Sequence, residues 1–475
     1  MASATAVARA RLGGLLDLAE RSPVYRELAS RLERSETVTV MDATAGARAF
    51  GWSALVATGG RTVALVAPSE DRARRWRAEL AGWLGEDRVL AFPEREPMPF
   101  EISAPSGGAV HQRLLTLWRL TRASAPVAVV TSLRALLQHT IPPDELARRG
   151  RTLRAGDRLA WQETATWLFD LGYEPVTEVS EPGTFSRRGG IIDIYPASAE
   201  EPARVELFGD EIETLRAFDP VTQRSQSDLA ELVVLPAREF GMERAAELAE
   251  RLAAAGWDRH ARDDEAATDL SGYARLVDAL REGGYAPGAD AFASALGADA
   301  SLLEHLGDRA TVVFEDTVDL ELSHDSLEAQ AEERRDELAG QGLTVAVFPT
   351  PYVPRSRIDG VAAQHGAVRV RPAADALRLG WTGVTSYAGR LDQFLREVAA
   401  GATDTRLVAT PQAARLAELL ADRDVTTVAR DAVDDVPATG SLVVARVPLA
   451  EGFALPELGV RVFTDAEVFG FRKPR

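Results

Sequence analysis

The fold class is decided by residues 62–84, which read TVALVAPSEDRARRWRAELAGWL. The run 62–67 is almost entirely apolar, which is typical of a strand buried on both faces of a sheet. Pro68 and Ser69 then open a segment whose apolar side chains recur at helical spacing. A strand followed directly by a helix is the repeating unit of a parallel α/β sheet.

The same alternation of strand and helix recurs along most of the chain. Further buried strands are predicted from short apolar runs, which lie at 37–41, 127–130, 233–235, 310–314, 406–410, 441–446 and 460–463. Residues 142–232 interrupt this alternation with short segments and tight turns that are typical of antiparallel strands.

These patterns predict an α/β protein of several domains. A degenerate RecA/helicase-like parallel-sheet domain is split by a mainly antiparallel α+β insert and followed by a small α/β domain, which suits a length of 475 residues. We predict the motor-like domain at 1–141 and 233–372, the insert at 142–232, the small domain at 373–470, and a linker or tail at 471–475.

Composition excludes several classes of function. The 72 acidic and 54 basic side chains give a net charge of −18, which disfavours general binding to DNA or to anionic membranes. Cysteine is absent, and no two histidines have the spacing of metal ligands, so we expect no metal and no cofactor. The chain has no apolar run of about 18 residues and no signal-peptide core, which predicts a cytoplasmic protein without a membrane anchor.

Residues 42–50, DATAGARAF, stand where a phosphate-binding loop would stand, between a strand and a helix. A working loop needs glycines that let backbone N–H groups wrap the phosphates, a lysine, and a hydroxyl for Mg²⁺. Here Gly46 is the remaining glycine, Arg48 takes the lysine position and Ala49 takes the hydroxyl position. The single lysine of the chain is Lys473, so we expect no ATP hydrolysis and no catalytic residue.

Glu315 and Asp316 follow a buried strand, where the second acidic element of a nucleotide site would lie. Because the first element lacks its lysine and hydroxyl, we predict that this pair is a solvated strand end and that these nucleotide-site positions are inactive.

The insert carries a different kind of candidate site. In residues 204–208, RVELF, alternation places Arg204 and Phe208 on one face of a strand and the aliphatic residues on the other. Arg188 begins the turn before the neighbouring strand. Arginine and aromatic side chains on a solvated sheet are typical of protein–protein interfaces. The alternative is that Phe208 packs under a loop and that the arginines form salt bridges at its rim, and the pattern alone leaves both possibilities open.

The insert also resembles a known family. Residues 184–196, TFSRRGGIIDIYP, and 204–213, RVELFGDEIE, resemble the second domain of the excision-repair protein UvrB, and the resemblance extends over about residues 37–340. UvrB has an intact phosphate loop, which this chain lacks. UvrB also has a long aromatic hairpin, whereas the corresponding stretch of this chain, residues 92–112, is short and contains no tyrosine. With a small α/β domain following, the sequence is more similar to the N-terminal region of the bacterial transcription-repair coupling factors, the Mfd family.

This resemblance implies a non-enzymatic module that binds UvrA through the surface that UvrB itself uses. The binding residues of the family fall on Arg188, Arg204 and Phe208. The resemblance also implies that RNA polymerase and DNA are contacted only through other parts of a full-length protein, and we expect a monomer that contacts no membrane. Two alternatives are an ATP-dependent DNA helicase or nucleotidase with a diverged phosphate loop, and a structural domain that inhibits a motor in the parent protein.

Overall fold

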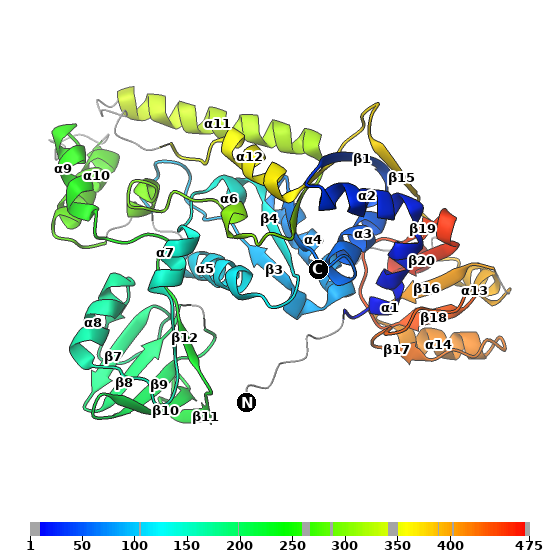
Figure 1. The fold of residues 1–475 in the computed structure, drawn as a ribbon, viewed down its shortest axis with the longest axis horizontal. Coiled ribbons are helices and arrows are strands. Elements are labelled where there is room, and N and C mark those ends of the chain that lie inside the picture. Colours follow the sequence, from blue (N-terminus) through cyan, green and yellow to red (C-terminus); the bar gives the residue numbers. More distant parts are fainter. Residues whose placement is uncertain are drawn as a thin grey trace.

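The computed structural model describes residues 10–103, 106–197, 199–258, 267–285, 288–340, 350–387, 389–400 and 403–470. The predicted tail at 471–475 lies outside the described residues. The described chain forms a central α/β body, a smaller sheet domain below it, a helical lobe beside it and a second α/β unit at the opposite end (Figure 1).

The body is built on a parallel sheet in which seven described strands take the order β15-β1-β14-β13-β2-β4-β3. Their bounds are β1 Thr37–Ala43, β2 Thr62–Ala67, β3 Val89–Phe92, β4 Ala128–Ser132, β13 Ala310–Phe314, β14 Ala367–Val370 and β15 Leu377–Trp381. Alternate residues of β2 enter two different cores, because Val63 and Leu65 pack on one face while Ala64 and Val66 pack on the other. The run that predicted a doubly buried strand therefore forms one.

Helices cover both faces of this sheet. They are α1 Gly13–Leu16, α2 Pro23–Glu33, α3 Ala45–Ala57 and α4 Glu70–Leu84 on one face, and α5 Gly107–Arg122, α6 Leu133–Leu137, α7 Pro143–Arg149 and α12 Arg355–His365 on the other. The long helix α11 Thr317–Gly340 runs across the top of the molecule toward the helical lobe (Figure 1). That lobe holds α9 Ala245–Ala254 and α10 Ala267–Arg281 around a core of its own that includes Trp257 and Phe292.

The insert forms a sheet in which six described strands take the order β11-β10-β9-β8-β7-β6. Neighbouring strands are antiparallel except for β6 and β7. The bounds are β6 Glu174–Pro175, β7 Thr184–Arg188, β8 Ile191–Tyr195, β9 Ala203–Phe208, β10 Glu211–Phe218 and β11 Ser225–Asp228. Helix α8 Trp161–Asp170 packs on this sheet, and the pair β5 Arg151–Leu153 and β12 Leu232–Val234 leads back to the body.

The C-terminal unit has a sheet of five described strands in the order β17-β18-β16-β20-β19. The bounds are β16 Thr405–Ala409, β17 Ala429–Arg430, β18 Leu442–Ala445, β19 Phe453–Leu455 and β20 Val460–Thr464, with helices α13 Leu391–Ala399, α14 Ala413–Ala421 and α15 Asp465–Phe469. The strands are parallel except for the edge pair β19 and β20. The predicted fold class, a parallel α/β domain with a mainly antiparallel insert and a second α/β unit, is confirmed.

The predicted start of the small domain at residue 373 needs one correction. Strand β15 lies after that boundary, yet it is the edge strand of the large sheet and pairs with β1. No strand was predicted at these residues, and the sheet that they join depends on a partner more than three hundred positions earlier. In the described chain, none of the helices combines the length and apolarity that a bilayer crossing needs.

Candidate functional site

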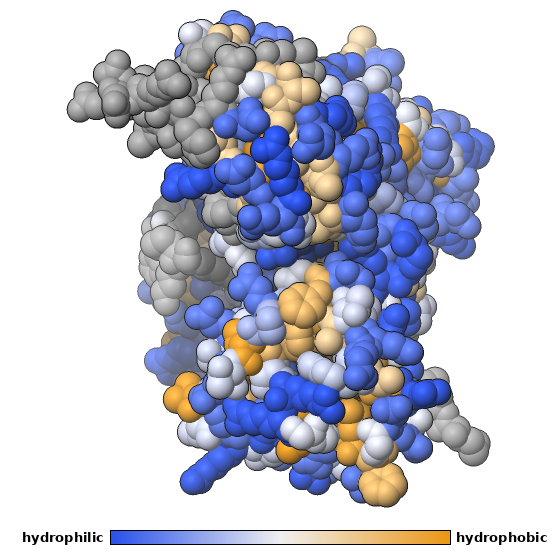
Figure 2. All heavy atoms as spheres, turned by 90° about the vertical axis from the view of Figure 1, so that its left-hand side faces the viewer, coloured by the Kyte–Doolittle hydropathy of each residue, from blue (hydrophilic) through white to orange (hydrophobic). Residues whose placement is uncertain are grey.

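The sheet of the insert has one covered face and one open face. Helix α8 packs on the first face, where Phe185, Ile192 and Val205 join Trp167 in a common core. The alternate positions of β9, which include Arg204 and Phe208, point to the other face. The surface of the insert, in the lower half of Figure 2, shows apolar side chains scattered among hydrophilic ones.

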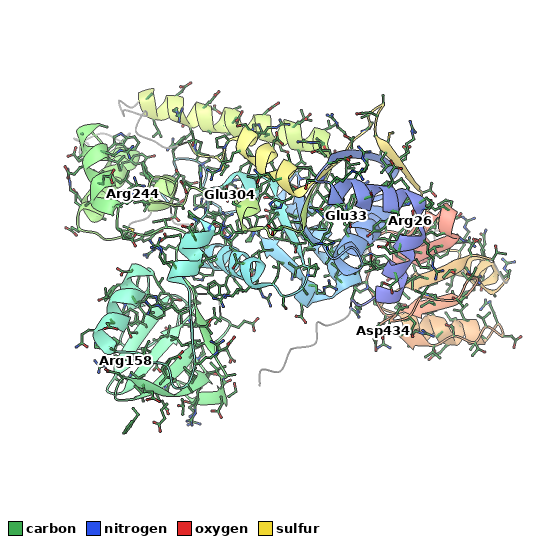
Figure 3. The ribbon with its side chains drawn as sticks, in the orientation of Figure 1. Arg26, Glu33, Arg158, Arg244, Glu304 and Asp434 are labelled. Carbon is green, nitrogen blue, oxygen red and sulfur yellow. The ribbon has the colours of Figure 1, made fainter. Side chains whose placement is uncertain are left out.

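Phe208 is the most prominent side chain of the open face. It is the last residue of β9, it pairs across the ladder with Glu211, and the side chain is 81% exposed. Gly209, with a φ of +67°, turns the chain immediately afterwards, so no later residue of β9 covers the ring. The alternative that Phe208 packs under a loop is therefore wrong. Arg158, labelled in Figure 3, marks this end of the insert, where it pairs with Asp210 at 3.7 Å.

Arg188 lies at the same end of the sheet as Phe208. It is the exposed last residue of β7 and pairs with Ile191 across the hairpin. The hairpin turn reaches β9, because the Leu207 N–H donates to the Gly190 carbonyl at 2.8 Å. The guanidinium of Arg188 donates to the Thr177 carbonyl at 3.2 Å and has no ion pair in the described parts of the chain. A full positive charge thus lies at the same end of the open face as the exposed ring, two strands away from it.

Arg204 belongs to the same face but has different surroundings. It pairs across the ladder with Asp193 and donates two hydrogen bonds to that carboxylate, at 2.8 and 3.0 Å. The guanidinium also lies 4.8 Å above the ring of Phe218 and donates to the Gln223 carbonyl at 3.3 Å. The bonds to Asp193 raise the pKa of Arg204, and the arginine side chain keeps only 16% of its surface exposed. The rim salt bridge considered as an alternative is therefore present at Arg204, and it fixes the side chain in place.

Reasoning from the sequence missed one residue of this face, Asp193. Asp193 is 1% exposed and holds Arg204, and its signal was a lone carboxylate in the apolar strand IIDIY at the ladder position opposite Arg204. Glu206 accepts a hydrogen bond from the Thr214 hydroxyl at 2.8 Å. Charges of both signs therefore surround the protruding ring.

The nucleotide-loop positions lie in the body, and the predicted loop is wrong. Strand β1 continues to Ala43, Thr44 caps the helix by accepting from the Ala47 N–H at 3.4 Å, and α3 begins at Ala45. Gly46, Arg48 and Ala49 are thus helical residues. A segment rich in alanine with a single glycine favours helix over an extended loop, so backbone N–H groups are not spread around a phosphate.

Glu315 also corrects a prediction, because it is buried and not solvated. The carboxylate accepts from Arg48 Nε at 3.1 Å and from Trp52 Nε1 at 2.7 Å, and the residue is 1% exposed. Burial raises the pKa of Glu315, while the charge of Arg48 and the bond from Trp52 act in the opposite direction. Asp316 does remain half-exposed and pairs with Arg72 at 2.8 Å. The position that a lysine and a Mg²⁺ ligand would occupy is filled by an internal ion pair.

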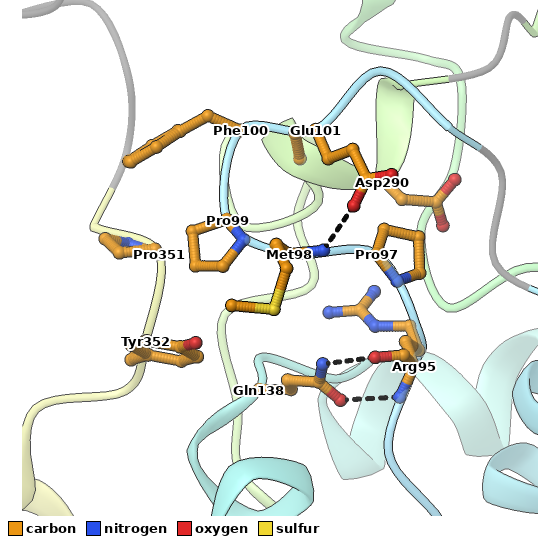
Figure 4. Close-up of a pocket in the computed structure, with 11 residues that line it drawn as sticks. Arg95, Pro97, Met98, Pro99, Phe100, Glu101, Gln138, Asp290, Pro351 and Tyr352 are labelled. Carbon is orange, nitrogen blue, oxygen red and sulfur yellow. Dashed lines mark hydrogen bonds between the residues drawn. The ribbon is translucent and has the colours of Figure 1, made fainter. Parts of the chain in front are cut away.

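Two hollows of different size lie away from the open face of the insert. The larger one, of about 840 Å³, lies between α5 and the insert and is lined by Trp118, Glu200 and Val233, and its volume is in the range of small-ligand sites. Figure 4 shows a pocket of about 50 Å³ in which Gln138 exchanges two hydrogen bonds with the Arg95 backbone, at 2.8 and 2.9 Å. Ligand sites usually have volumes of about 300–1,000 Å³, so this pocket has room for water only. Among the described residues, no group of three or more histidine, aspartate and glutamate side chains could hold a metal ion.

Comparison with known proteins adds a family context. The family described as the UvrB interaction domain matches residues 152–240, which include the open face. A transcription-repair-coupling factor from Bacillus subtilis is 34% identical over 195 residues, covering 41% of this chain and 16% of that protein. The one from Escherichia coli is 31% identical over 184 residues, covering 39% of this chain and 16% of that protein.

A longer match covers nearly the whole chain. The transcription-repair-coupling factor of Mycobacterium tuberculosis is 29% identical over 502 residues, covering 97% of this chain and 39% of that protein. The chain therefore spans less than half the length of these relatives. The resemblance that the strings of the insert indicated is confirmed by both comparisons.

Proposed function

We propose that this chain is a non-catalytic recruitment module of transcription-coupled nucleotide excision repair, and that its insert binds UvrA by mimicking UvrB. The observation that carries the proposal is the open face of the insert, where an exposed phenylalanine and an arginine that forms no ion pair with the described residues lie within a segment that matches a UvrB interaction domain. Protein interfaces concentrate their binding energy in such aromatic and arginine anchors.

Each of the three residues has its own role in this proposal. Phe208 enters a pocket of the partner, because burying an exposed ring removes apolar area from water. Arg188 pairs with a carboxylate of the partner. Arg204 is already held by Asp193, so it loses little side-chain entropy when the partner arrives.

Mimicry has a consequence for the order of events. UvrB and this chain would compete for one surface of UvrA, so that UvrB displaces the module once UvrA has been recruited. We propose that the chain acts as a cytoplasmic monomer, and that RNA polymerase and DNA are reached through other parts of a longer protein.

The proposal is tested by titrating purified UvrA into the chain in a calorimeter. Arg188→Ala and Phe208→Ala should each weaken binding by about 2 kcal/mol or more. Phe169→Ala is the matched aromatic control, since Phe169 is 54% exposed but lies on the covered side of the sheet, against Phe185. Arg74→Ala, an exposed arginine of the body, controls for charge. Normal affinity in both test variants would overturn the assignment.

We also propose that the chain does not hydrolyse ATP, against the alternative of a helicase or nucleotidase. Two features support this proposal. Arg48 stands at the lysine position and forms an ion pair with Glu315, and Ala49, which has no hydroxyl, stands at the Mg²⁺-binding position in the first turns of α3. Phosphate release in the presence of ATP, Mg²⁺ and duplex DNA should equal that of a buffer blank. Turnover that disappears in Arg48→Ala would favour the helicase alternative. An inhibitory role toward a motor in the parent protein is compatible with recruitment.

A further inference from the structure

A loop of the C-terminal unit, residues 447–453, covers the first turn of helix α3. The Glu451 carboxylate accepts a hydrogen bond from the Gly46 N–H at 3.1 Å. A Cβ atom at Gly46 would lie 2.3 Å from the Glu451 carbonyl oxygen, so only glycine allows the two backbones to approach so closely. The glycine that remains from the phosphate-loop pattern therefore serves this contact.

The same loop is held by the neighbouring helix α4. The Ala450 N–H donates to Glu79 at 2.7 Å, and Glu79 is buried under the loop. A Cβ atom at Gly82 would lie 2.7 Å from the Leu449 side chain. Helix α3 thus offers an N–H and a glycine to this short segment, and α4 offers a carboxylate and a glycine.

The contact is part of a continuous junction between the two α/β units. Thr382, just after the edge strand of the large sheet, exchanges two backbone hydrogen bonds with Ala454, at 3.1 and 2.7 Å. Phe453 packs against Phe50 and Trp83, with ring centroids 5.7 and 6.0 Å apart. All three rings are buried, so the end of the loop, where it enters β19, is packed into the core of the body.

The first turn of a helix presents unpaired N–H groups and the positive end of the helix dipole, which together favour an anion. In a motor-like sheet this is the place of a nucleotide phosphate. We propose that residues 447–453 are an internal ligand of the body, in which the Glu451 carboxylate takes the place of a phosphate at α3 and fixes the C-terminal unit on the large sheet. The C-terminal unit thereby excludes nucleotides and makes the two sheets one rigid support for the insert.

The test compares amide hydrogen exchange in the wild type, Glu451→Ala and Glu451→Gln. In Glu451→Ala, peptides covering residues 45–48 and 447–454 should exchange about tenfold faster, because the bond that joins them is lost. Glu451→Gln keeps an oxygen acceptor, so its exchange should rise by only about threefold. Glu418→Ala, an exposed glutamate of α14 in the same unit, should exchange as the wild type does.

Inorganic pyrophosphate tests whether the Glu451 carboxylate occupies the anion position at the first turn of α3. It should slow exchange at residues 45–48 in Glu451→Ala and have no effect on the wild type. Unchanged exchange in Glu451→Ala and Glu451→Gln, or equal protection of the wild type by pyrophosphate, would overturn the proposal. Affinity for UvrA should be the same in all these variants, because Glu451 lies outside the insert. The recruitment proposal can therefore fail or hold independently of this one.

Discussion

Arg204 and Asp193 are not equivalent members of their ion pair. The Asp193 carboxylate is enclosed by the sheet, whereas the guanidinium of Arg204 lies at its surface and keeps a partial exposure. Removing the arginine therefore strands a buried charge, while removing the aspartate leaves a cation that can turn toward water. The pair supports the stability of the insert and, in our proposal, also orients a binding residue.

This asymmetry predicts two different costs in folding free energy. Arg204→Ala should lower the free energy of unfolding by about 3 kcal/mol, and Asp193→Ala by about 1–2 kcal/mol, as measured by urea denaturation. The double variant should lose less than the sum of the two, since the residues contact each other. Arg216→Ala, which breaks a pair with the exposed Asp228, should cost under about 0.5 kcal/mol. Equal costs for the two single variants would contradict the burial argument.

The same pair affects how a binding experiment on Arg204 must be read. A loss of UvrA affinity in Arg204→Ala combines a lost contact with a weakened insert, whereas Arg188 and Phe208 are exposed and have few partners in the fold. The latter two variants therefore report on binding with less interference from stability.

At the scale of elements, the sequence correctly predicted those structural features that depend on residues close together in the chain. The doubly buried β2 followed from an apolar run, and the shared face of Arg204 and Phe208 followed from the two-residue period of a strand. Those patterns depend only on residues a few positions apart. The family resemblance added which partner such a face would bind, which alternation alone could not provide.

Two features that the sequence did not predict depend on residues far apart in the chain. Glu315 is buried because Arg48 and Trp52, more than 250 positions earlier, neutralise and bind it. Strand β15 joins the large sheet because β1 offers it an edge. The expected loop at residues 42–50 is absent because β1 and α3 need only Thr44 between them. For Glu315 the acidic residue was identified correctly and its environment comes from a distant segment, whereas the strand at 377–381 was not predicted and the start of α3 at Ala45 is a local feature.

At the scale of the whole molecule, the hydrophobic cores do not correspond one to one with the sheets. One hydrophobic core runs from the large sheet into the C-terminal unit, since it contains Trp52 and Trp83 of the body together with Val443 and Phe453. The insert has a separate core between its sheet and α8. Its entry and exit strands pair with each other, with Arg151 opposite Val234, so the ends of the insert lie side by side (Figure 1). A unit with its own core and adjacent ends is suited to fold by itself.

We therefore expect residues 150–238 to fold as an isolated domain. This segment keeps the β5–β12 pair and the bond from the Ala237 N–H to the Leu171 carbonyl at 2.8 Å. Circular dichroism should show a single cooperative melting transition, and calorimetry should show an affinity for UvrA within about threefold of that of the whole chain, a difference under about 1 kcal/mol.

The complementary deletions separate binding from support. Replacing residues 151–234 by a short glycine linker should abolish UvrA binding and leave the melting of the body in place, because the shared core is untouched. A chain that ends at residue 400 should instead be insoluble or unstable, since Phe50 and Trp83 would lose Phe453, and Trp381 would lose the Glu457 carboxylate to which it donates at 3.2 Å. If the isolated insert folds but does not bind UvrA, the binding surface must extend beyond the open face, and the body would have to contribute contacts of its own.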